Sequence, residues 1–239
     1  LWAHEPVKSR ELVALCAEHL GWKPTTTYTV IKRLSERGVL KNENTVVTSL
    51  ISQDEAQTAE IDELLEAIME RTSIPHVRIS SVEPMDISER LLKVMARYPQ
   101  RIAPFLHLPV QSGCTATLHR MGRPYSAEAF EDTVRMIRAN LPQASLSCDV
   151  IVGFPGETDE EFEDTIRLCD KVRYDAMFTF IYSKRTGTKA AEMPDPTPRK
   201  EKTDRMSRLL KMQDEIAMNL VKAQVGQTVK VLVEGYGRA

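Results

Sequence analysis

The spacing of apolar side chains predicts two consecutive helices at the start of the chain. Over residues 9–20 the apolar positions share one helical face, with Ser9 as the expected cap and Gly21 as the stop. A second helix is predicted to begin at Pro24, where a missing N–H costs nothing, and to stop at Gly38.

A hairpin pattern follows these helices. Residues 39–51 carry two short apolar runs around a polar turn at residues 41–44. Helix, helix and hairpin in this order predict a small α+β winged helix-turn-helix domain over residues 1–59.

From residue 60 to residue 225 the pattern alternates between short apolar runs and helical spacing. Repeated strand–helix units of this kind predict an α/β domain with parallel strands covered by helices. The predicted strands are residues 77–81, 105–110, 146–152 and 176–182. The predicted helices are residues 61–71, 88–97, 127–140, 160–171 and 202–223, and residues 228–234 alternate as one more strand.

Charge and composition narrow the class of protein. The net charge of −2 gives no overall attraction to nucleic acid, so such binding requires local patches. We expect no membrane span and no signal peptide, and four reduced, dispersed cysteines in a cytoplasmic protein. Because Leu1 is not a methionine, we also expect a truncated start.

Polar residues and glycines follow each predicted strand of the second segment. In a parallel α/β barrel the carboxyl ends of the strands hold the ligand. One such run would be an ordinary turn, but four in succession predict a binding face. The runs are residues 80–84, residues 111–114 with 121–125, residues 153–158 and residues 182–188.

These runs belong to longer motifs that resemble the tRNA methylthiotransferases of the radical-SAM superfamily. The similarity covers about residues 61–235 and is closest to the branch that acts on isopentenylated adenosine. It implies a partial radical-SAM (β/α) barrel over residues 60–225 and, over residues 226–239, the opening of a TRAM-like β-domain. The motifs are residues 78–81, 106–113, 121–125, 149–158 and 178–190.

The resemblance implies a 2-methylthio transfer to tRNA that uses S-adenosylmethionine and a four-iron, four-sulfur cluster. Arg123 is the expected partner of the carboxylate of S-adenosylmethionine, because a guanidinium binds a carboxylate with two parallel bonds; a surface salt bridge is the alternative. The residues that the resemblance places along the S-adenosylmethionine site are Ser81, Gln111, Arg123, Asp149, Val152, Gly153 and Phe154.

One departure from the family pattern bears on activity. Family members hold the cluster with a Cys-x-x-x-Cys-x-x-Cys loop, and this chain contains no such spacing. Since a cluster needs its thiolates, we expect no metal ligands and no catalytic residues here. The chain alone is therefore predicted to be inactive.

The first segment resembles penicillinase-repressor-type winged-helix regulators. Residues 21–40 are similar to their recognition helix and residues 45–52 to their wing, which implies binding to duplex DNA. The alternatives are therefore a DNA-binding regulator, or a fusion artefact without selected function. The expected DNA-binding residues are Thr25, Thr26, Thr27, Tyr28, Lys32 and Arg33.

A partial barrel also has physical consequences. Strands that are buried on both faces in a closed barrel would here meet water, and the sheet would have open edges. We therefore expect marginal stability, self-association, or a partner that completes the barrel.

Overall fold

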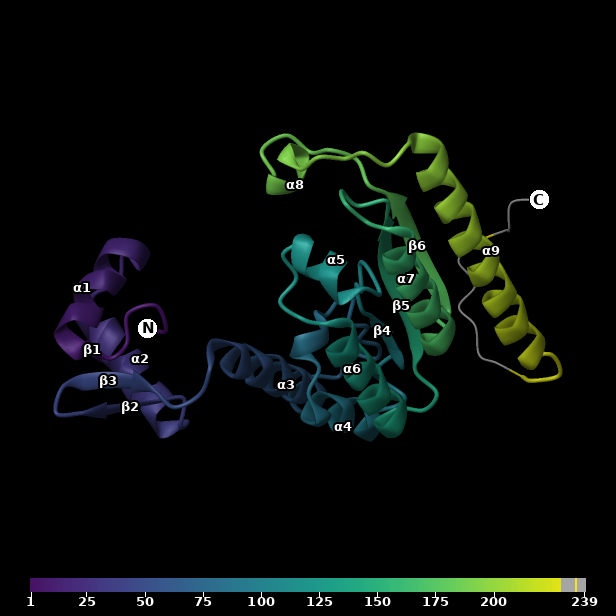
Figure 1. Cartoon of the computed structure of the whole chain (residues 1–239). Helices are drawn as coiled ribbons and strands as arrows, with labels where there is room; N and C mark the ends of the chain where they lie inside the picture. Colours follow the sequence, from purple (N-terminus) through teal and green to yellow (C-terminus); the bar gives the residue numbers. More distant parts are fainter. Residues whose placement is uncertain (229–234, 236–239) are drawn as a thin grey trace. The chain divides into compact units, whose positions relative to one another are not determined.

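The computed structural model describes residues 1–228 and residue 235, except for the side chains of residues 54 and 57–59 (Figure 1). The predicted strand at residues 228–234 therefore lies almost wholly outside the described residues. Contacts divide the chain into two compact units, residues 1–76 with 85–101 and residues 77–84 with 102–239. Among the described residues, no helix is both long and apolar enough to cross a membrane.

The first unit opens with an antiparallel sheet and two helices. The sheet has the order β1-β3-β2, and α1 packs on α2. A small core of Val7, Leu12, Ile31, Leu40 and Val47 holds these elements together. The elements are β1 (Val7–Lys8), α1 (Ser9–Leu20), α2 (Pro24–Glu36), β2 (Leu40–Glu43) and β3 (Val46–Ser49).

Three local predictions have different outcomes in this part. Pro24 is the first residue of α2, as predicted. Ser9 is not a cap, because it is the buried first residue of α1 and Lys8 occupies the cap position. The hairpin turn is shorter than predicted: Lys41 belongs to β2, and Asn44 and Thr45 make the turn with positive φ angles.

A long helix, α3 (Gln53–Arg71), runs through the predicted boundary at residues 59 and 60. It begins with a capping box in which Ser52 and Glu55 bind each other's backbone amides. Arg101 donates to three backbone carbonyls at or just beyond its other end, those of Met69, Thr72 and Ile74. Helix α4 (Glu89–Arg97) packs on α3 and has the predicted serine cap, Ser88.

The second unit contains a parallel sheet of order β4-β5-β6. Helix α9 packs against β6 and β5, and α7 packs against α6 and α9 (Figure 1). The elements are β4 (Phe105–His107), α5 (Thr115–Arg120), α6 (Ala127–Asn140), β5 (Ser145–Val152), α7 (Asp159–Val172), β6 (Ala176–Ile181), α8 (Lys189–Glu192) and α9 (Arg199–Ala223).

The predicted first strand of this unit is wrong. Among the described residues, residues 77–81 form only an isolated bridge, between Val77 and Ile102. The predicted strand at residues 105–110 ends at His107. The short helices α5 and α8 were not predicted at all.

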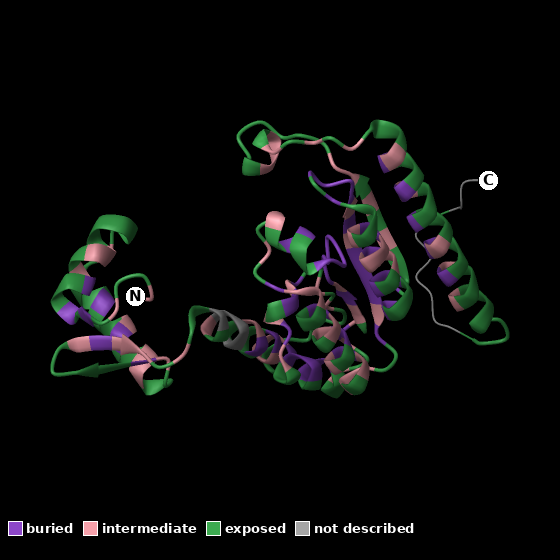
Figure 2. Cartoon of the chain, viewed as in Figure 1, coloured by how far each residue is buried: buried purple, intermediate pink, exposed green. Residues whose placement is uncertain are grey.

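The two faces of the parallel sheet differ in burial. On β5, Leu146, Cys148 and Val150 are fully buried. On β6, Phe178 and Phe180 are 55% and 53% exposed. Figure 2 shows this strand in the colours of exposed and intermediate residues. The exposure of these aromatic side chains agrees with the expectation that part of the sheet meets water.

Candidate functional site

The site begins where the chain leaves β4 and crosses to β5. Gln111 donates its amide to the Asp149 carbonyl at 2.8 Å and accepts from the Ile151 amide at 2.9 Å. Its φ angle of +66° is uncommon for a residue that is not glycine. Strained backbone of this kind is held in place by its surroundings and is found often at functional sites.

A cavity of about 690 Å³ opens at the strand ends of the second unit. Four of the predicted site residues line it: Gln111, Arg123, Asp149 and Phe154. Gln111 follows β4 and Arg123 follows α5, while Asp149 lies within β5 and Phe154 just beyond it. The structure therefore brings together residues that are up to 43 positions apart, from Gln111 to Phe154.

The other three predicted residues lie elsewhere. Val152 is fully buried, and the Gly153 amide donates to Glu157 at 2.7 Å. Both support the turn after β5, although neither is among the described residues that line the cavity. Ser81 is exposed and also lies outside this lining, because its segment is not a strand and does not end at the site.

Arg123 has a protein partner. Its Nη1 lies 3.2 Å from Glu83 Oε1, and both side chains are partly exposed, at 30% and 44%. Ion pairs of this exposure are weak and exchange readily with a competing carboxylate. The alternative of a surface salt bridge is thus observed, and it leaves Arg123 at the cavity wall.

Asp149 borders a second hollow on the inner face of the sheet, of about 520 Å³. Its Oδ2 lies 3.5 Å from His107 Nε2, while His107 Nδ1 lies 2.9 Å from Ser147 Oγ. Phe178 meets the His107 ring edge-on at 5.8 Å between centroids. This hollow combines aromatic faces with one imidazole and one carboxylate.

Sequence reasoning missed the other residues that line the cavity, among them the aromatic residues Phe180 and Tyr182. Tyr182 opens the polar run at residues 182–188, which marked a strand end without singling out a side chain. It makes an edge contact with Phe154 at 5.2 Å between ring centroids. The alternation of side chains along β6 could have placed Phe180 on the same face as Phe178.

On α2, five of the six predicted DNA-binding residues are exposed: Thr25, Thr26, Tyr28, Lys32 and Arg33. Thr27 is only 2% exposed, so its selection was wrong. It lies on the helix face that carries the buried Ile31 one turn later. Its hydroxyl finds no hydrogen-bond partner among the described residues.

The cysteines do not fit a four-iron cluster. Cys114, Cys148 and Cys169 are buried on separate elements, and Cys16 lies in the first unit. Across the residues that the structure describes, no three His, Cys, Asp or Glu side chains converge on a metal-binding point. No step is therefore assigned to a cluster held by this chain.

Comparison with known proteins identifies the family. The model of the radical SAM superfamily matches residues 16–169, which is more than half of the chain. The chain belongs to the radical SAM superfamily. The match begins within α1, inside the segment predicted as a winged helix.

Several curated relatives carry the name tRNA-2-methylthio-N(6)-dimethylallyladenosine synthase. That of Caldicellulosiruptor saccharolyticus is 41% identical over 73% of this chain and 37% of its own length. That of Pelotomaculum thermopropionicum is 36% identical over 89% of this chain and 47% of its own length. The chain thus spans less than half the length of these relatives.

A solved structure supports the fold. The coproporphyrinogen III oxidase of Escherichia coli, described as a radical SAM enzyme, superposes with a TM-score of 0.53 and 20% identity. The superposition covers 66% of this chain and 37% of the oxidase. At this identity the likeness concerns the α/β fold and not the reaction.

Proposed function

We propose that the chain is the S-adenosylmethionine-binding part of a tRNA-modifying enzyme that adds a 2-methylthio group to isopentenylated adenosine. The names of the relatives support this reaction and this substrate. The observation that carries the proposal is the convergence of Gln111, Arg123, Asp149 and Phe154 on one cavity.

The side chains that line this cavity are of the types that would bind the three parts of S-adenosylmethionine: its adenine, its ribose and its amino-acid end. Phe154 and Phe180 offer apolar faces for an adenine ring, and Asp149 and Gln111 offer acceptors for hydroxyl or amino groups. Arg123 would exchange Glu83 for the carboxylate of the amino-acid end. When bound beside a cluster in this superfamily, S-adenosylmethionine supplies radical chemistry.

We further propose that this polypeptide alone does not perform the reaction. The sequence contains no Cys-x-x-x-Cys-x-x-Cys spacing, so it offers no thiolate set for the cluster. Reconstitution of the chain with iron and sulfide should leave its visible spectrum flat and S-adenosylmethionine intact. A visible cluster band with reductive cleavage would overturn this part.

The binding proposal is tested by titration calorimetry of the chain with S-adenosylmethionine. Asp149→Asn should weaken binding about tenfold or more, because it removes a charged acceptor at the cavity wall. Asp132→Asn is the matched control, since Asp132 is 68% exposed on α6 and pairs only with the nearby Arg135 in the described contacts. No measurable binding by the unmodified chain, or equal effects of the two variants, would contradict the proposal.

A second candidate function is duplex DNA binding by residues 1–59. The order of helix, helix and hairpin and the exposed hydroxyl and basic side chains of α2 favour it. Binding of a DNA duplex should then weaken steeply with salt, and Lys32→Gln with Arg33→Gln should reduce that salt dependence. Binding that ignores both changes would remove this candidate.

A further inference from the structure

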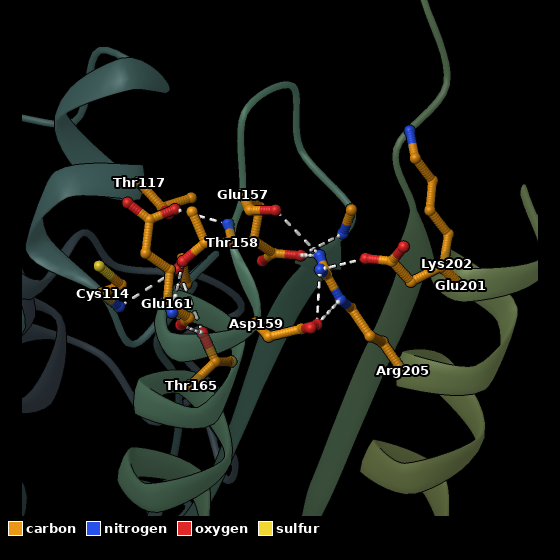
Figure 3. Close-up of polar contacts among 12 residues, drawn as sticks. Cys114, Thr117, Glu157, Thr158, Asp159, Glu161, Thr165, Glu201, Lys202 and Arg205 are labelled. Carbon is orange, nitrogen blue, oxygen red and sulfur yellow. Dashed lines mark hydrogen bonds and ion pairs between the residues drawn. The ribbon is translucent and has the colours of Figure 1, made fainter. Parts of the chain in front are cut away.

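Helix α9 holds the turn that follows β5 through a buried arginine. The Arg205 side chain is only 5% exposed, although it carries a full charge. Figure 3 shows it reaching from α9 toward carboxylates of the turn and of the start of α7. Its Nη2 donates to Asp159 Oδ1 at 2.8 Å and to Glu201 Oε1 at 2.5 Å.

Arg205 binds the backbone of the turn once directly and once through the Glu157 carboxylate. Its Nη1 donates to the Glu157 carbonyl at 3.1 Å and to Glu157 Oε2 at 3.0 Å. The same Oε2 accepts the Gly153 amide at 2.7 Å, while Glu157 Oε1 has no partner among the described residues. One carboxylate thus joins the guanidinium to the amide of Gly153.

The burial of Glu157 explains why this link needs Arg205. The Glu157 side chain is 1% exposed, and burial raises the pKa of its carboxyl, while the Gly153 amide and Arg205 act against that rise. A buried carboxylate without its cation is strongly unfavourable. Loss of Arg205 would therefore disturb the acceptor that binds Gly153.

Lys202, about one turn before Arg205, packs on the same glycine. A Cβ at Gly153 would lie 2.6 Å from both Cγ and Cδ of Lys202, so the stem of the lysine occupies the space of a side chain. The Lys202 ammonium binds Asp195 at 2.6 and 2.7 Å and lies 5.8 Å from the centre of the Tyr182 ring.

The cavity wall lies directly beyond these contacts. Phe154 follows Gly153 in the turn, and Tyr182 receives Lys202 on its ring; both line the 690 Å³ cavity and touch each other. Arg205 and Lys202 are absent from the described lining. Any effect of the two residues on the cavity would therefore pass through Gly153, Phe154 or Tyr182.

We infer that Arg205 and Lys202 are positioning residues that hold Phe154 and Tyr182 in the arrangement that receives S-adenosylmethionine. This inference rests on the proposed function for the identity of the ligand. The positioning itself concerns the ligand-free chain, and it can be measured there.

The chain offers a matched control on the same helix. Arg208 also leaves α9 toward α7, where it pairs with Glu163 at 2.5 Å, and it also approaches the Phe162 ring. Unlike Arg205, it is 54% exposed and does not contact the turn in the described structure. Arg205→Gln and Arg208→Gln therefore remove the same charge from one helix at two different places.

The experiment has two readouts on the whole chain: hydrogen exchange of the peptide that contains Gly153, without ligand, and calorimetric binding of S-adenosylmethionine. Arg205→Gln should speed exchange of that peptide at least tenfold and weaken binding at least tenfold, whereas Arg208→Gln should change neither. Arg205→Lys should fall between them, because a single ammonium cannot serve Glu157 and Asp159 as a guanidinium does.

A folded Arg205→Gln chain with the exchange and binding of the unmodified chain would overturn the inference. If the unmodified chain binds no S-adenosylmethionine, the proposed function fails, and the exchange comparison still decides whether the turn is held by α9. If Arg205→Gln does not fold, Lys202→Met and Lys202→Ala decide. Methionine keeps an apolar stem against Gly153, so Lys202→Met should preserve the slow hydrogen exchange of the Gly153 peptide. Lys202→Ala removes that stem and should speed the exchange. Equal exchange rates in the two variants would overturn the inference.

Discussion

The neighbouring strands β5 and β6 pair at six positions, and yet the side chains on the two faces of their sheet differ in burial. On the face of the sheet that helices cover, side chains of β5 such as Cys148 and Val150 are fully buried. Phe178 and Phe180 of β6 pair with Asp149 and Ile151 on the other face and are more than half exposed.

The difference separates what stabilises this unit from what binds. The helix-covered face is a close-packed core, in which loss of a methyl group is felt. The inner face carries aromatic and ionisable side chains that border two hollows. Stability should therefore depend on the first face and ligand binding on the second.

The largest test compares one residue from each strand. Leu146→Ala on β5 should lower the free energy of unfolding by about 2–5 kcal/mol, because it leaves a cavity in a fully buried site. Phe178→Ala on β6 should change it by only about 0.5 kcal/mol, since most of that ring is already in water. Urea denaturation measures both values, and similar losses would end the contrast between the two faces.

The second test uses alkaline pH. Burial raises the pKa of Tyr125 from 10.0 to about 12, and its hydroxyl donates to the Pro109 carbonyl at 2.9 Å. Between pH 10 and pH 12 the phenol of Tyr125 stays protonated in the folded chain and loses its proton in the unfolded chain. The free energy of unfolding therefore has its full value below pH 10 and falls as the pH rises toward 12.

With allowance for solvent screening, the Tyr125 share of that loss is about 1–2 kcal/mol. Tyr125→Phe should make the free energy of unfolding fall less steeply over this range in urea titrations. An unchanged slope would mean that the phenol is not buried as the structure has it.

The third test uses thiol reactivity on the folded chain. Cys114, Cys148 and Cys169 are buried, and burial raises the pKa of Cys169 to about 12. These three should resist a disulfide reagent until the chain unfolds, because the thiolate is the reactive form. Only Cys16, which is partly exposed, should react early, and Cys16→Ser should abolish that early phase.

The smallest expected effect concerns association. The free edge of β6 has no strand partner among the described residues, and Phe178 adds an exposed ring beside it. Phe178→Ala should weaken self-association and so modestly raise the chain concentration at which light scattering exceeds the value of a monomer. Identical concentration dependence in both chains would place the contact elsewhere.

Local signals in the sequence were sufficient for several elements. The helix predicted over residues 127–140 has these bounds as α6, because Ser126 caps it and accepts from the Ala129 amide. The strand predicted over residues 146–152 is β5 with one more residue, since its apolar run is buried.

Other elements depended on contacts that are distant in sequence. Residues 77–81 alternate apolar and polar side chains only as far as Ser80, and their only pairing with other described residues is the bridge at Val77, which no local pattern reveals. Likewise four of the predicted binding residues, Gln111, Arg123, Asp149 and Phe154, line one cavity, whereas Ser81 does not; their binding of a ligand stays a prediction. Arg205 and Glu157 are 48 positions apart, and the sequence around either residue contains no motif that predicts their contact.

Asp149 borders both hollows of the second unit, and so does Phe180. A molecule in either space would lie beside the same carboxylate and the same aromatic ring as a molecule in the other. Thermodynamic reciprocity then requires that two occupants influence each other's affinity by the same factor, whichever arrives first. Any influence of one occupant on the other would thus pass through the wall that the two hollows share at Asp149 and Phe180.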